Sequence, residues 1–193
     1  MNTFSKYFFI LLASSIIFTS VHAREKGRHV IIPKLGAYEI DTANQSSNRN
    51  FTTESDWVYG VEYEWHLGKN FSIGGEHMQF ENDFTNTGVT YTSTTDAVLF
   101  NAKYHFPVTD AFKPFIGLGL GAAVIDTEEF LFDTYSGRAY QFTAGMTYRF
   151  EHVGIYFEYK RLRAKLKEDI DTGNADRIDV SGKGAMLGIS ILL

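Results

Sequence analysis

Apolar and polar side chains alternate with a period of two along most of this chain. The clearest case runs from Trp57 to Leu67, where every odd position is bulky and apolar and every even position from Gly60 onward is glycine or polar. Such an alternation places the two kinds of side chain on opposite faces of a β-strand. We predict strands in eight segments, at residues 29–40, 56–67, 71–81, 95–106, 112–125, 137–150, 153–164 and 181–193.

The connections between these segments are alternately short and long. Residues 68–70, 107–110 and 151–152 are short enough for hairpin turns, whereas 41–55, 82–94, 126–136 and 165–180 are long and polar. An even number of strands with this asymmetry is typical of barrels in the bacterial outer membrane. The sequence therefore predicts an all-β protein, an eight-stranded antiparallel up-and-down transmembrane β-barrel, with both termini in the periplasm and four long loops outside the cell.

A soluble barrel has the same alternation with its faces reversed, so side-chain volume has to decide which face lies outside. Eight strands enclose a lumen only just wide enough for side chains to fill. The apolar face carries too many large residues for that space: Trp57, Tyr59, Tyr63, Trp65, Phe100, Tyr104, Phe106, Tyr140, Phe142, Tyr148, Phe150, Phe157 and Tyr159, with several Ile and Leu. We therefore expect these residues to face lipid and the glycine-rich polar face to line the lumen.

The first 23 residues are expected to be removed before folding. Lys6 precedes an apolar run over residues 7–18, and the stretch ends at Ala23, which is the pattern of a cleavable secretory signal. The run is too short for a membrane-spanning helix. We expect export by the Sec pathway, with residues 1–23 as signal peptide and residues 24–193 as the barrel domain.

The charge balance narrows the choice of partners. The chain has 18 Lys and Arg against 23 Asp and Glu, for a formal net charge of −5. A protein that binds nucleic acid gains its affinity from neutralising phosphates with basic residues. The acidic balance therefore argues against nucleic acid as a partner.

At this point the chain resembles the small outer-membrane β-barrel family, which includes the OmpA-like transmembrane domain and the OmpX and OmpW groups. The final stretch from Gly188 to Leu193 is similar to the assembly signal of that family in its glycine and alternating apolar positions, although it ends in Leu193 rather than an aromatic residue. The resemblance implies a Gram-negative envelope protein in contact with outer-membrane lipids, lipopolysaccharide and the barrel assembly machinery.

Charged side chains occupy the face that is predicted to line the lumen. We expect a lumen charge network of Glu62, Glu64, Glu76, Lys103, Arg149, Glu158 and Lys160, with Asn101, His105, Lys113 and Gln141 on the same face. Unpaired charges in a water-poor interior are costly, so acids and bases there should pair. A plug of salt bridges and a gated or ion-selective pore are the two interpretations that remain open.

Catalysis has little support in the sequence. Lipid A deacylases share this architecture and use a closely spaced His and Ser, but none of the strand histidines His66, His77 and His105 lies two residues from a serine. There is no cysteine, and the spacing of the histidines does not predict a metal site. We therefore expect no catalytic residues, no cofactor and no metal.

A basic run follows the point where strand 153–164 leaves the membrane. Arg161, Arg163, Lys165 and Lys167 continue the outward face above the apolar belt. Clustered Lys and Arg bind phosphate well, so these residues are candidates for lipopolysaccharide contact, with ordinary snorkelling as the alternative.

The sequence thus favours a non-enzymatic outer-membrane protein with a charge-plugged lumen, serving envelope structure and surface contact through its loops. The loops are rich in Asn, Thr and Ser, a composition compatible with a host or surface ligand. A narrow porin-like channel for small solutes is the alternative, and a lipid A-modifying enzyme is a weaker third.

Overall fold

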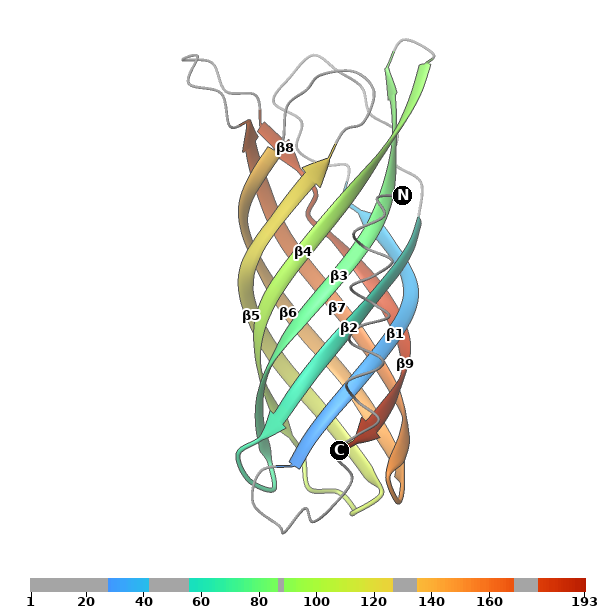
Figure 1. Cartoon of the computed structure of the whole chain (residues 1–193), viewed down its shortest axis with the longest axis vertical. Helices are drawn as coiled ribbons and strands as arrows, with labels where there is room; N and C mark the ends of the chain where they lie inside the picture. Colours follow the sequence, from blue (N-terminus) through green and yellow to red (C-terminus); the bar gives the residue numbers. More distant parts are fainter. Residues whose placement is uncertain (1–27, 42–55, 87–88, 127–134, 169–176) are drawn as a thin grey trace.

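The chain folds into a single closed barrel of antiparallel strands (Figure 1). The computed structural model describes residues 28–41, 56–86, 89–126, 135–168 and 177–193. Its strands are β1 (Arg28–Ile40), β2 (Asp56–His66), β3 (Phe71–Asn86), β4 (Val89–His105), β5 (Phe112–Asp126), β6 (Tyr135–Phe150), β7 (Val153–Glu168), β8 (Arg177–Asp179) and β9 (Gly182–Leu192). The described residues include no helix with the length and apolar character needed to cross a membrane.

The barrel closes because β1 pairs with both β2 and β9, and β7 pairs with β6 and β9. β8 and β9 together form the eighth strand of the barrel, because both pair with β7. β8 pairs with the part of β7 nearer the loop end, and β9 pairs with the rest. The ladder is interrupted between them, where Ala164 N–H bonds the Ser181 hydroxyl at 3.1 Å. Because the barrel is closed, each of its eight strands is paired on both sides. A sheet can lie in lipid only when its backbone groups are bonded in this way.

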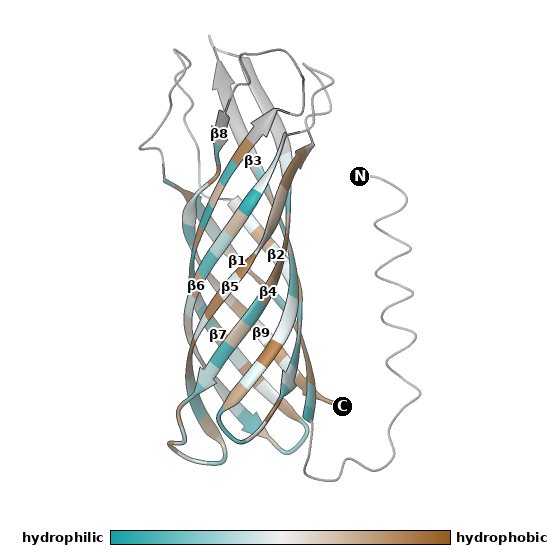
Figure 2. Cartoon of the chain, turned by 90° about the vertical axis from the view of Figure 1, so that its left-hand side faces the viewer, coloured by the Kyte–Doolittle hydropathy of each residue, from teal (hydrophilic) through white to brown (hydrophobic). Residues whose placement is uncertain are grey.

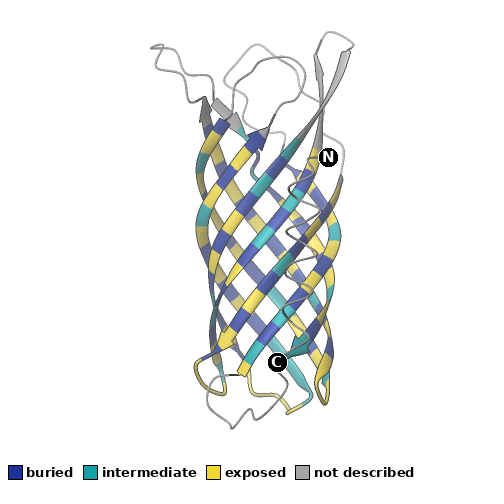
Figure 3. Cartoon of the chain, viewed as in Figure 1, coloured by how far each residue is buried: buried dark blue, intermediate teal, exposed yellow. Residues whose placement is uncertain are grey.

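Exposure alternates along each strand as the sequence predicts (Figure 3). The exposed large hydrophobic residues include Trp57, at 72% exposure, and nearly all of the predicted outward aromatics. Figure 2 shows the same alternation as apolar and polar bands along the strands. The assignment of the bulky face to lipid is confirmed, and its physical basis is that the lumen has no room for it.

The predicted loop at residues 82–94 is wrong. β3 continues to Asn86 and β4 begins at Val89, and the two strands stay paired to the last residue, Asn86 opposite Val89. They form a hairpin that rises beyond the rest of the barrel (Figure 1). The sequence pattern does not predict this extension, because residues 82–94 lack a sustained alternation of apolar and polar positions, although their Thr residues and Tyr91 favour strands.

The predicted loop at 165–180 is also shorter than expected, because β7 runs to Glu168 and β8 pairs with it. The short connections all lie at the opposite end of the barrel. In the two-residue turn between β6 and β7, Glu151 takes a left-handed backbone with φ of 46°. The predicted signal peptide at 1–23 lies outside the described residues.

Candidate functional site: a charge network in the lumen

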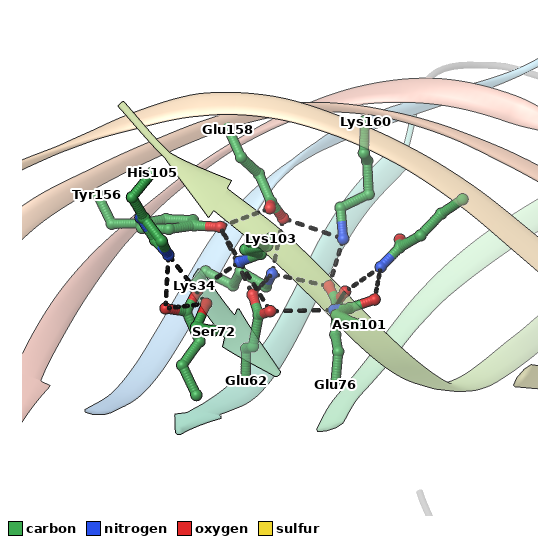
Figure 4. A network of polar contacts seen from close by, with 12 residues as sticks. Lys34, Glu62, Ser72, Glu76, Asn101, Lys103, His105, Tyr156, Glu158 and Lys160 are labelled. Carbon is green, nitrogen blue, oxygen red and sulfur yellow. Dashed lines mark hydrogen bonds and ion pairs between the residues drawn. The ribbon is translucent and has the colours of Figure 1, made fainter. Parts of the chain in front are cut away.

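A network of buried ion pairs and hydrogen bonds joins side chains inside the barrel (Figure 4). Lys34 lies at its centre, with its ammonium 2.8 Å from Glu62, 2.8 Å from Glu76 and 2.6 Å from Glu158. All four side chains are fully buried. One lysine on β1 therefore joins carboxylates from β2, β3 and β7, of which β7 is distant from the other strands in sequence.

Two further lysines complete the pairing. Lys160 forms ion pairs with Glu76 and, at 3.0 Å, with Glu158. Lys103 approaches Glu62 at 2.7 Å and Glu64 at 2.6 Å. Each buried carboxylate thus has at least one ammonium partner, which offsets the large free-energy cost of removing the charges from water.

Neutral groups satisfy the remaining acceptors. The Tyr156 hydroxyl donates to Glu158 at 2.6 Å. The Asn101 amide donates to Glu62 and Glu76, both at 3.0 Å, and the Gln141 amide donates to Glu76 at 2.6 Å. A buried polar network stabilises a fold only when nearly all of its groups are bonded, and this network comes close to that condition.

Glycines make room for these long side chains in a narrow lumen. Most network residues have a glycine directly opposite on a neighbouring strand: Gly60 and Gly188 beside Lys34, Gly74 beside Glu64, Gly117 beside Lys103, Gly119 beside Asn101 and Gln141, Gly145 beside Glu158, and Gly184 beside Lys160. The glycine-rich face therefore serves the network, because a side chain at these positions would compete with the charged groups for space.

Apolar clusters lie on both sides of the network. Between it and the loop end of the barrel lies a cluster that includes Tyr38, Phe80, Leu99, Leu162 and Leu166. A smaller cluster of Val30, Ile32, Phe115 and Tyr156 lies toward the turn end. On the loop side the lumen is therefore apolar, whereas on the turn side apolar and polar side chains share the cross-section.

The structure brings together most of the candidate lumen residues: Glu62, Glu64, Glu76, Lys103, Glu158 and Lys160. It places Arg149 elsewhere. Arg149 lines a vestibule of about 1000 Å³ at the turn end, together with Arg28 and Lys113, and makes no ion pair within the described part of the chain. Lys34 and Tyr156 also belong to the network and were not predicted from the sequence, although Lys34 follows Val30 and Ile32 at the period of two that marks the inner face.

The basic run lies on the outer surface above the apolar belt. Arg161, Arg163 and Lys165 all point outward, Arg161 contacting Asp41 at 3.2 Å and Lys165 contacting Asp179 at 3.9 Å. The side chain of Lys167 is outside the described set. Register adds two cations that the sequence run does not contain, Lys183 opposite Arg161 and Arg138 opposite Lys165.

A serine, a histidine and a glutamate meet at the turn end of the network. The Ser72 hydroxyl lies 2.9 Å from Nε2 of His105, and the Glu64 carboxylate lies 3.7 Å from that same nitrogen (Figure 4). A catalytic triad needs the acid on the other ring nitrogen, so that the base can take the serine proton. This arrangement is not that of a nucleophile and its base.

The closed barrel, its apolar outer belt and its charged interior define an integral membrane β-barrel of the bacterial outer membrane. The chain belongs to the outer membrane protein beta-barrel domain family, whose model matches residues 9–189. A comparison with curated protein sequences finds no match.

Solved structures share this fold at low sequence identity. OprG from Pseudomonas aeruginosa is 14% identical with a TM-score of 0.62, and the aligned region covers 89% of this chain and 98% of OprG. Neisserial surface protein A is 13% identical with a TM-score of 0.60, covering 86% and 99%. Ail of Yersinia pestis, solved with the heparin analogue sucrose octasulfate, is 12% identical with a TM-score of 0.50, covering 88% and 100%.

Proposed function

We propose that this protein is a non-conducting, non-enzymatic barrel that anchors surface elements in the outer membrane. The filled lumen carries this proposal. The network side chains are almost completely buried, and an apolar cluster lies in the lumen between them and the loop end of the barrel. A conducting pore needs a continuous water-filled path, which such a cross-section leaves no space for.

Planar-bilayer recording of the refolded mature chain tests the closed lumen. We expect no reproducible single-channel steps, while an established porin added to the same bilayer gives them. Heat-dependent migration on a gel verifies that the inserted protein is folded. Regular steps from folded protein would instead favour the alternative, a narrow channel for small solutes.

The outward cations support a role in envelope structure through lipopolysaccharide. Arg138, Arg161, Arg163, Lys165 and Lys183 lie on the adjacent strands β6, β7 and β9 above the apolar belt. Glu39, Asp41 and Asp179 balance part of this charge. The cations stand at the level of the outer-leaflet head groups, where the phosphates of lipopolysaccharide are found.

Co-purification of lipopolysaccharide tests this contact. We expect an Arg161→Ser/Arg163→Ser variant to retain less lipopolysaccharide than the unchanged protein. Lys69→Ser is the matched control, because Lys69 is an exposed cation in the turn at the opposite end. Equal retention by all three proteins would overturn the proposal.

The β3–β4 hairpin is the candidate element for surface contact, since it projects beyond the barrel rim (Figure 1). Ail, which shares the fold, was solved with a heparin analogue. We expect cells carrying a variant with residues 82–93 replaced by a short turn to bind less to a cultured epithelial monolayer. Unchanged binding by a variant that still folds would remove the hairpin from this role.

A further inference from the structure

Four polar atoms converge at the turn end of the charge network. Nε2 of His66 lies 3.4 Å and Nε2 of His105 lies 3.7 Å from the same oxygen of Glu64. The Ser72 hydroxyl lies 3.5 Å from that oxygen and 2.9 Å from His105. Ligands of a tetrahedral zinc ion, at bonds of about 2.0–2.1 Å, stand roughly 3.4 Å apart. The two histidine nitrogens lie at nearly this distance from the Glu64 oxygen, and the ligand atoms of Glu64, His66 and His105 all lie within 4.8 Å of one another.

The network contains a second group of potential metal ligands, but a lysine already occupies the space between them. Glu62, Glu76 and Glu158 also bring their oxygens together, but the Lys34 ammonium lies among them at 2.6–2.8 Å and already supplies the positive charge. At Glu64, the lysine partner Lys103 contacts the other carboxylate oxygen. It fixes the carboxylate and leaves the oxygen that faces the histidines to another partner.

A small cavity adjoins these residues. Its volume is about 10 Å³, and Glu64, His66, His105 and Ser190 are among the residues that line it. A space of roughly this size holds one water molecule. The Ser190 hydroxyl is buried and has no hydrogen-bond partner among the described residues. A metal-bound water in this cavity would supply the partner that the hydroxyl needs.

The ion pairs of the network leave one carboxylate charge in excess. Four carboxylates, Glu62, Glu64, Glu76 and Glu158, face three ammonium groups, Lys34, Lys103 and Lys160. These ion-paired groups leave one negative charge, and Glu64 is the carboxylate next to two histidines. Lys113 and Arg149, which line the adjoining cavity, balance part of the negative charge of the network without forming an ion pair with it.

We infer that Glu64, His66 and His105 form a binding site for a divalent transition-metal ion of the zinc class, open to the periplasm. Two imidazoles and one carboxylate supply three ligands, and the adjoining cavity supplies space for a water as the fourth. The vestibule, which His66 also lines, gives the ion a route from the periplasmic side. The sequence does not predict this site, because the two histidines lie on different strands.

Lys113 and Arg149 line the same cavity and oppose the binding of a cation. Arg149 is also attracted to Glu64 without reaching ion-pair distance. These two cations are expected to weaken the affinity of the site for a metal ion, and this effect can be tested by substitution. Removing one of their charges should tighten metal binding, whereas a merely structural cluster would not respond in this way.

The test is a titration of the refolded, chelator-treated mature chain with Co²⁺ and Zn²⁺. We expect saturable binding of one ion per chain, with the intense visible absorption of four-coordinate Co²⁺, displaced by Zn²⁺. His66→Ala and His105→Ala should each abolish it, and Lys113→Gln should tighten it several-fold. His77→Ala is the matched control, because His77 pairs with Asp96 on the outer surface.

Heat-dependent migration shows whether each variant is folded, and His105→Gln replaces His105→Ala if the smaller side chain prevents folding. Binding that is lost in the His66 and His105 variants and kept in the His77 variant supports the site. Absence of saturable binding, or binding that persists in folded His66 and His105 variants, overturns it. Neither result depends on whether the lumen conducts.

Discussion

Lys160 illustrates how the lumen tolerates charge at the level of single residues. Its side chain is fully buried, and its partners Glu76 and Glu158 are fully buried too. Burial of an ion pair contributes little net stability by itself, but removal of one partner leaves a charge that neither water nor protein compensates. The interior therefore depends on each member of the network, whereas exposed ion pairs of the same chemistry contribute little.

Replacement of Lys160 by Met should destabilise the barrel by about 3–5 kcal/mol, because Glu76 and Glu158 lose a shared partner. Urea titration in lipid, followed by heat-dependent migration, measures the change. Lys183→Met is the control, since Lys183 and Glu39 are both about half exposed and their pair contributes roughly 0–1 kcal/mol. Adding Glu76→Gln to Lys160→Met should recover much of the loss, because this double change keeps the charge balance. Equal effects of the Lys160 and Lys183 changes would contradict the network.

Two adjacent glycines should differ sharply in their tolerance of a methyl group. A Cβ on Gly74 would lie 1.9 Å from the Tyr63 carbonyl oxygen, whereas a Cβ on Gly75 would meet nothing within 4 Å. We expect Gly74→Ala to destabilise the fold by about 1–3 kcal/mol through overpacking. Gly75→Ala should stay within about 0.5 kcal/mol. The same urea titration measures both, and similar values for the two would show that β2 and β3 are not so closely packed.

At the level of elements, the β3–β4 hairpin separates two sources of strand stability. Within the membrane, lipid requires every backbone group to be bonded inside the protein. Beyond it, residues 82–86 pair with residues 89–93 in a part of the hairpin where water can also bond the backbone groups. This part of the hairpin is therefore a two-stranded ribbon that continues the β3–β4 ladder of the barrel.

Hydrogen exchange should detect that ladder directly. Amides of residues 82–86 and 89–93 that bond across the hairpin should exchange more slowly than a freely exposed chain, though faster than amides at mid-barrel, because local openings of a thin ribbon need little free energy. NMR of the isotope-labelled protein in detergent resolves both groups. Exchange at the rate of an unstructured peptide would restore the long loop that the sequence pattern predicts.

At the scale of the whole molecule, the outer surface carries the adaptation to lipid. The exposed aromatic residues include both tryptophans, Trp57 at 72% and Trp65 at 42%, which lie near opposite ends of β2. Aromatic rings at the two ends of a strand match the two interfaces of a bilayer. The barrel is therefore held in position at both membrane surfaces.

Fluorescence quenching by brominated lipids tests this placement, and the chain offers a clean probe because it has only two tryptophans. Trp57→Phe and Trp65→Phe each leave a single emitter. We expect each to be quenched more strongly by lipids brominated near the glycerol end of the acyl chain than by lipids brominated near its tip. Quenching by an aqueous reagent alone would contradict an outward, lipid-facing aromatic face.

The sequence pattern alone is sufficient to predict the architecture, the outward face and the class of membrane. These follow from a period of two, from side-chain volume and from alternating connection lengths, all of which are local properties. It failed at residues 82–94, because these residues lack a sustained alternation of apolar and polar positions. Lumen residues such as Glu62 and Glu158 could be predicted from the alternation that places them on the inner face of their strands. The residues with which they pair could not be predicted in this way.

The pairing of the strands into a closed barrel is what brings particular groups together across the lumen. Lys34 joins carboxylates from three strands, and Glu64 meets histidines that the sequence keeps 39 residues apart at His66 and His105. The shear and closure of the barrel fix these neighbours, because register between strands sets which inward positions share a level. Strand alternation therefore specifies which side chains enter the lumen, and closure specifies the chemistry they form there.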